Sequence, residues 1–203
     1  MVAPQTPNRR RFPIVALIVC CCVAAVPGCT RKLPNGRVAP HAPVQQDLLP
    51  WGEPIRFKRF TLTPIAHFDV EARVLGAMRY SFDHEAQLAP VDLALGWGPM
   101  SDNQVLEDLH ISQMVRFYRW EGRELPLEPG QIVENSANMH MIPADAGIRR
   151  TLLRVRRNDI VSFSGYLVSI RGDDGWMWNS STTRNDTGDG ACEVVWVDSL
   201  QVR

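Results

Sequence analysis

Apolar and polar side chains alternate along several stretches of the chain, which is the pattern of strands with one face in a core. Between residues 68 and 74, apolar side chains at the even positions are separated by Asp69, Glu71 and Arg73. The same alternation, or a high content of β-branched and aromatic residues, predicts further strands over 114–120, 137–142, 160–170, 176–178 and 191–202.

Three stretches carry helical signals instead. Residues 89–95 form a short apolar piece that is led by a proline and stopped by a glycine, which favours one or two helical turns. Residues 101–109 favour a second short helix, because Ser101 and Gln104 have the spacing of a capping box. Residues 145–156 place their apolar side chains on one helical stripe with arginines around it, which predicts a third helix.

Together these elements predict an α+β fold, a small β-rich domain with two or three short helices. An OB-like closed or partly open barrel is one arrangement of such strands, and it removes exposed sheet edges. The polar lead Asn158-Asp159 into the strand 160–170, Gly165 within that strand and the closing hairpin fit an OB-like meander.

The first 28 residues have the order of an export signal, which is basic, then apolar, then small. Arginines at 9–11 precede an apolar run of 15 residues over 12–26, shorter than the roughly 20 residues that span a bilayer. Gly28 precedes Cys29, the arrangement that a lipoprotein signal peptidase cuts, so we expect Cys29 to become the lipidated N-terminal residue. A plain secretory signal is one alternative, and an uncleaved anchor with the basic flank Thr30-Arg31-Lys32 is another.

A lipid on Cys29 predicts a protein of the cell envelope, anchored on the periplasmic side of a bacterial membrane. Thr30 stands where an aspartate often accompanies inner-membrane retention, which favours the outer membrane. Five prolines predict that residues 29–54 form an extended tether with unpaired backbone. The single β-rich globular domain is then expected over residues 55–203.

The charge balance argues against a nucleic-acid-binding protein. The chain has 22 basic and 22 acidic residues, and the leader removes three arginines and no acid, which leaves 19 against 22 and a net charge of −3. The five histidines are scattered without the spacing of a zinc site. We therefore expect no metal and no cofactor.

Cysteine usage leaves one thiol to explain. Three of the five cysteines lie in the apolar leader and Cys29 is the expected lipid site, so Cys192 has no partner for an internal disulfide. A buried and inert thiol is the ordinary outcome for such a residue. The alternative is a nucleophile with His140 as its base, oriented by Asp186 or Glu193. Because Cys192 begins an apolar strand and His140 lies between two methionines, the sequence favours structural roles for both.

Two segments, 93–102 and 176–193, join tryptophans to loops of small polar residues. In one interpretation the tryptophans pack beneath the loops, whose hydroxyl groups close the turns. In the other, the segments form a ligand groove with candidate residues Trp97, Trp176, Trp178, Arg184 and Asp186.

The region 63–203 resembles a family of exported bacterial proteins to which no activity has been assigned. The resemblance lies in the stretches 89–102, which contains Leu95-Gly96-Trp97-Gly98-Pro99, 135–143, which contains Asn138-Met139-His140-Met141, and 173–193, which begins Asp173-Asp174-Gly175-Trp176. It implies one recurring domain, and it assigns no substrate and no catalytic residues.

These observations favour a lipid-anchored, periplasm-facing binding or assembly accessory protein without catalytic activity. Its expected partners are the membrane, through the N-terminal lipid, and a protein of the envelope. The alternative is a small cysteine-dependent hydrolase or transferase that uses Cys192 and His140.

Overall fold

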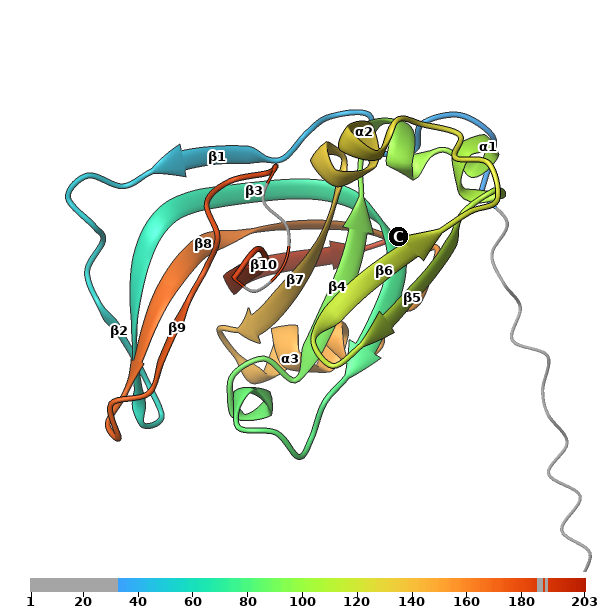
Figure 1. Cartoon of the computed structure of the whole chain (residues 1–203). Helices are drawn as coiled ribbons and strands as arrows, with labels where there is room; N and C mark the ends of the chain where they lie inside the picture. The colour runs from blue at the N-terminus through green and yellow to red at the C-terminus, as the bar shows by residue number, and fades with distance from the viewer. Residues whose placement is uncertain (1–32, 186–187, 189) are drawn as a thin grey trace, which may run out of the picture.

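The structure is a computed structural model that describes residues 33–185, 188 and 190–203. Within these residues the chain forms ten strands, three α-helices and two 3₁₀ helices (Figure 1). The strands are β1 (Val44–Asp47), β2 (Ile55–Phe57), β3 (Phe60–Arg79), β4 (Val91–Gly96), β5 (His110–Met114), β6 (Phe117–Glu121), β7 (Ser136–Pro143), β8 (Ile160–Gly172), β9 (Met177–Asn179) and β10 (Glu193–Val202). The helices are η1 (Glu85–Gln87), η2 (Gly98–Ser101), α1 (Asn103–Leu106), α2 (Pro129–Glu134) and α3 (Ala146–Leu152).

Five of the strands close into a hydrogen-bonded ring in the order β3–β4–β7–β10–β8, and β8 pairs with β3 again. Numbered by their place in the chain, the ring strands follow the order first, second, third, fifth, fourth. The third and fifth, β7 and β10, run parallel, and the other neighbours are antiparallel. The predicted α+β fold class, a small β-rich domain with three short helices, is confirmed.

The longest strand, β3, makes the closed ring possible. Its 20 residues pair with β8 over 60–73 and with β4 over 73–79, so one strand serves both sides (Figure 1). Register shifts at 64–66 and 74–76 are the irregularities that bend a strand of this length. The alternation predicted for residues 68–74 is confirmed: Phe68 and Val70 point into the core and Asp69 points out.

The core fills the ring with side chains from all five strands, and α3 adds Leu152 to it. The strand predicted over 160–170 is confirmed as β8, and Gly165 within it allows β10 to come close. A Cβ on Gly165 would lie 1.9 Å from the carbonyl oxygen of Trp196, so no larger residue fits there without moving the backbone.

The prediction of a short helix over 89–95 is wrong, since Val91–Gly96 is the central strand β4. All six of its residues are buried. Leu93 and Leu95 face the ring core, while Ala94 lies in a second cluster beneath the β5–β6 hairpin. A strand covered on both faces loses the alternating pattern, and a short continuous apolar run does not distinguish a strand from a helical turn.

The predicted single strand over 114–120 is instead part of a hairpin, formed by β5 and β6. The turn residues Val115 and Arg116 have φ of 49° and 69°, the left-handed conformation that two-residue hairpin turns require. No glycine or asparagine marks this turn in the sequence, so the alternating pattern alone predicts one uninterrupted strand.

Two of the three α-helices lie inside the ranges predicted for helices. Helix α3 occupies residues 146–152 of the predicted range 145–156, and Asp145 caps it by accepting a hydrogen bond from the Ile148 amide at 2.8 Å. Helix α1 is shorter than 101–109, and its N-cap is Asp102, not Ser101. Helix α2 was not predicted.

The predicted unpaired tether over 29–54 is wrong from Leu33 onward, because this segment packs on the domain. Strand β1 pairs with residues 66–69 of β3. The Asn103 side-chain amide donates to the carbonyl oxygens of Leu33 at 2.6 Å and Pro34 at 3.1 Å. The folded domain therefore includes residues 33–54, since an extended, proline-containing segment can still lie along a sheet edge.

The predicted leader 1–28 and the predicted lipid site Cys29 lie outside the described residues. Within the part of the chain that the structure describes, no helix has the length and apolar character needed to cross a membrane.

Candidate functional site

The candidate site lies on the outer face of β4 and β7, the side turned away from the ring core. Asp92 on β4 is opposite His140 on β7, and Asn138 lies two residue pairs further along on the same face. The β5–β6 hairpin covers part of this face, and Gln113 of the hairpin donates to Asn138 Oδ1 at 2.9 Å. Two adjoining pockets remain between the hairpin and the segment 176–193.

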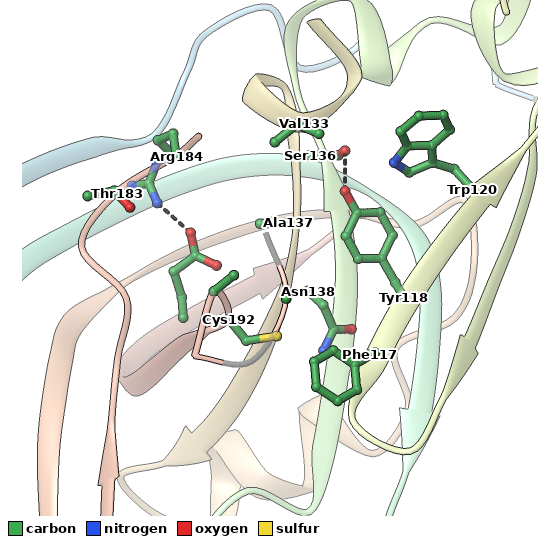
Figure 2. A pocket seen from close by; sticks show the side chains of 13 residues that line it. Phe117, Tyr118, Trp120, Val133, Ser136, Ala137, Asn138, Thr183, Arg184 and Cys192 are labelled. Atoms are coloured by element: carbon green, nitrogen blue, oxygen red, sulfur yellow. Dashed lines mark hydrogen bonds and ion pairs between the residues drawn. The ribbon is translucent and has the colours of Figure 1, made fainter. Parts of the chain in front are cut away.

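The first pocket has a volume of about 170 Å³ and an aromatic wall. Figure 2 shows Phe117, Tyr118 and Trp120 along β6, at one side of the pocket. Phe117 remains 41% exposed, which is unusual for a large apolar side chain on a paired strand. The aromatic wall therefore leaves apolar ring surface open to a ligand.

The opposite wall of the first pocket is polar but its charges are compensated. Arg184 Nη1 lies 2.5 Å from Glu193 Oε1. Figure 2 shows Arg184 across from the aromatic residues. Arg184 also donates to Gln45 Oε1 of β1 at 3.0 Å, and its guanidinium stacks over Phe68 at 4.8 Å from the ring centroid. These contacts hold Arg184 in place and, among the described residues of this wall, pair its charge with that of Glu193.

Tyr118 fixes the back of the first pocket. The Tyr118 hydroxyl lies 2.8 Å from Ser136 Oγ. The Ser136 hydroxyl in turn donates to the Ile132 carbonyl oxygen of α2 at 2.6 Å. Burial raises the pKa of the Tyr118 phenol above its ordinary value, so the group stays neutral and available as a hydrogen-bond donor.

The second pocket, of about 330 Å³, adjoins the first through shared residues. Phe117 and Cys192 line both pockets, and His140 and Trp178 line only the second. We call the two joined pockets the outer-face groove.

Arg116 at the hairpin turn ties the edge of the groove together. Its guanidinium forms a two-point contact with Asp83, with Nη2–Oδ1 at 2.7 Å and Nε–Oδ2 at 3.0 Å. It also donates to Asp92 Oδ1 at 2.7 Å and stacks 3.8 Å from the ring centroid of Tyr80. Burial opposes ionisation of Asp83, but the Arg116 hydrogen bonds outweigh it and hold the pKa of this carboxyl below its ordinary value.

His140 and Cys192 lie in the same pocket, as the catalytic hypothesis requires. His140 Nδ1 lies 3.0 Å from Oδ1 of the fully buried Asp92, and its ring packs 4.8 Å from Trp178. Cys192 Sγ lies 3.8 Å from the Arg116 carbonyl oxygen. The carboxylate beside the imidazole is therefore Asp92 and not Glu193, which pairs with Arg184.

The structure separates the residues that were proposed to form a tryptophan-lined groove. Trp178 and Arg184 line the outer-face groove. Trp97 is 1% exposed and lies in the ring core, so its proposed role in the groove is wrong. Trp176 packs against Phe60 instead, 5.8 Å between ring centroids, and lines neither pocket. Asp186 lies outside the described residues.

Sequence reasoning missed five residues of the groove and its edge: Asp92, Arg116, Phe117, Tyr118 and Trp120. A signal for the aromatic members existed, because three aromatic side chains occur within four residues of a strand that also carries Arg119 and Glu121. Asp92 had no such signal, since its partners lie on other elements of the ring.

Among residues 33–185, 188 and 190–203, no group of three or more histidine, cysteine or acidic side chains could hold a metal ion.

Comparisons with other proteins give no family for this chain: no family model, no curated protein and no solved structure matches it. The resemblance to exported bacterial proteins stays a prediction.

Proposed function

We propose that this protein is a lipid-anchored binding protein of the bacterial envelope that holds its ligand in the outer-face groove without catalysing a reaction. The observation that carries this proposal is the aromatic wall of β6 facing a charge-compensated polar wall across an open pocket. Ligand sites commonly combine apolar surface with a few fixed polar groups in this way.

The groove favours a neutral ligand with flat apolar faces, and we propose an oligosaccharide. The Arg184 charge is already taken by Glu193, so an anionic ligand would have to displace a buried carboxylate. Thr183 lines the polar wall with a neutral hydroxyl. The Ser136 and Asn138 side chains, which line the same pocket, are held by Ile132, Gln113 and Arg116. The strand order of the ring is compatible with an OB-like arrangement, whose second and third strands receive oligosaccharides or oligonucleotides. The net charge of −3 argues against the latter.

Titration with N-acetylglucosamine tetramer, followed by the indole N–H signals in nitrogen–proton NMR spectra, tests this proposal. We expect the Trp120 and Trp178 signals to shift and those of Trp97 in the core and Trp51 to stay unchanged, because only the first pair lines the groove.

Variants at matched tryptophans make the same test quantitative. Trp120→Ala should weaken binding at least about tenfold, the loss expected for one stacked ring. Trp51→Ala is the control, because Trp51 is 60% exposed and lies outside the groove. Equal affinity in the two variants, or no shift of any indole signal, would contradict a sugar site in this groove.

The anchoring part of the proposal depends on Cys29. Cys29→Ser should release the protein from the membrane fraction and slow processing of the precursor, because the sulfur that carries the lipid is gone. Unchanged membrane retention would favour an uncleaved N-terminal helix instead.

A second candidate function, cysteine-dependent hydrolysis or transfer, is favoured by the shared pocket of Cys192 and His140 and by Asp92 beside the imidazole. Labelling of the folded protein with a thiol-reactive disulfide separates the two proposals, with Cys192→Ser giving the background from other thiols. Fast labelling that His140→Ala slows would favour the enzyme. Slow labelling that His140→Ala leaves unchanged would favour the binding protein.

A further inference from the structure

The side of the domain where the chain leaves toward Cys29 has an unusual charge. Leu33 is held there by the Asn103 side chain and is 8% exposed. Only four residues, 29–32, precede Leu33 after the expected cleavage site. They reach at most about 14 Å, so a lipid on Cys29 would keep this side of the domain at the headgroup layer.

A chain of hydrogen bonds places arginines beside this exit point. Arg73 Nη1 donates to Asn103 Oδ1 at 2.6 Å, and Arg73 Nη2 donates to Asn158 Oδ1 at 2.8 Å. Arg156 and Arg157 directly precede Asn158 in the chain. They therefore lie next to the residue at the other end of the hydrogen-bond chain that starts at Leu33.

A shallow surface hollow reaches the exit point from the other direction. Leu33 lines it together with Arg37, Ile160 and the C-terminal Arg203. Arg37, Arg156 and Arg157 are exposed. We call these three exposed arginines the exit-side arginines.

None of the three exit-side arginines has an ion-pair partner among the described residues. Two nearby carboxylates bind backbone amides instead: Asp102 accepts from Gly36 and Gln104, and Asp159 accepts from Arg156. Arg203 is paired, with Glu71. Burial and the charge of Arg157 lower the pKa of Arg73, and the charge of Asp102 opposes this shift.

We infer that the exit-side arginines bind the headgroups of anionic phospholipids and orient the domain on the membrane. The inference rests on the proposed lipid anchor at Cys29, which brings this side to the bilayer. Guanidinium groups bind phosphate at two points, and exposed basic residues near an anionic surface add to the hold of a lipid chain.

Flotation with phospholipid vesicles tests the inference, using Cys29→Ser protein that begins at residue 29, so that neither the lipid nor the apolar leader contributes. At about 50 mM salt we expect binding to vesicles with 30% phosphatidylglycerol and little binding to phosphatidylcholine alone, because the screening length is long enough for surface charges to act. The triple variant Arg37→Gln, Arg156→Gln, Arg157→Gln should bind about a hundredfold more weakly.

A matched triple variant controls for the loss of net charge. Arg119→Gln, Arg123→Gln, Arg171→Gln removes three exposed arginines from other elements and should bind as the parent does. Circular dichroism in the near ultraviolet establishes that both variants are folded.

Three results would overturn the inference: equal loss in both triple variants, equal binding to the two kinds of vesicle, or binding of a 20-base-pair DNA duplex as tightly as the anionic vesicles. The anchor at Cys29 is judged separately, by the membrane retention of Cys29→Ser in cells. Release in cells without binding to anionic vesicles would therefore reject the lipid-headgroup assignment alone.

Discussion

The outer-face groove and the exit side hold their arginines in opposite ways. In the groove, Arg116 and Arg184 each meet a carboxylate that is almost or wholly buried. On the exit side, Arg156 and Arg157 point to solvent and no ion pair involves them among the described residues. Charges that are satisfied inside the molecule shape a rigid site, whereas unsatisfied exposed charges remain available to an anionic partner.

The contrast predicts that loss of Arg116 in the groove lowers the free energy of unfolding far more than loss of an exit-side arginine. Arg116→Ala would leave Asp92, which is fully buried, with an uncompensated charge, and removing one member of a buried ion pair typically lowers stability by about 3–5 kcal/mol. Urea unfolding measures this loss. Arg119→Ala on the same hairpin is the control, because its side chain is 73% exposed. Losses of similar size in the two variants would show that the Arg116 contacts do not stabilise the fold.

A neutral hydrogen bond in the groove should have a smaller effect. Tyr118→Phe removes the hydroxyl that contacts Ser136 and is expected to lower stability by about 1 kcal/mol in urea unfolding. Ser136 retains its bond to the Ile132 carbonyl oxygen, which limits the loss. Tyr166→Phe on β8 is the comparison, since no hydrogen bond of its hydroxyl is found within the described residues. If Tyr118→Phe is as stable as Tyr166→Phe, the hydrogen bond of the Tyr118 hydroxyl does not stabilise the fold.

The ion pair of Arg116 with Asp83 also predicts a dependence on pH. The pKa of Asp83 is lowered in the folded protein, so the stability it adds is present above the ordinary value of 3.8 and is lost as pH falls below that value. The difference in unfolding free energy between the parent and Asp83→Asn should therefore be constant from pH 7 to about pH 4 and then shrink. The effect is modest, because the Asp83 side chain is 35% exposed. A difference that persists unchanged to pH 2 would contradict this account.

On the exit side we expect almost no effect on stability. Arg157→Gln removes an exposed arginine and relieves its repulsion of Arg73, so the change in unfolding free energy should lie within about 0.5 kcal/mol. A loss of several kcal/mol would mean that Arg157 has a structural role and would weaken the contrast between the two regions.

Sequence patterns identified the strands that have one face in the core and one face toward solvent. The strand 160–170 and the alternation over 68–74 were correct, because each of these strands turns one face to the ring core. The pattern failed where an element is covered on both sides, as for β4, whose six residues are all buried. It also failed at Leu33, where a long-range contact with Asn103 fixes a segment that has no local reason to be ordered.

The candidate site was predictable only in part, because it depends on register between distant strands. The composition of 176–193 indicated Trp178 and Arg184. That Asp92 lies beside His140 follows from the pairing of β4 with β7, which are almost 50 residues apart and show no local sign of contact. The structure therefore supplied the partner of the imidazole that the sequence had assigned to Glu193 or Asp186.

The turn at Val115 and Arg116 has a consequence for the order in which the molecule assembles. A β-branched residue such as Val115 rarely adopts a positive φ, so this turn has little tendency to form in an isolated peptide. Contacts with Asp92 and Asn138 become available only after β4 and β7 have paired. The hairpin should consequently be a late addition in folding, and changes at its tip should speed unfolding and leave the refolding rate nearly unaltered.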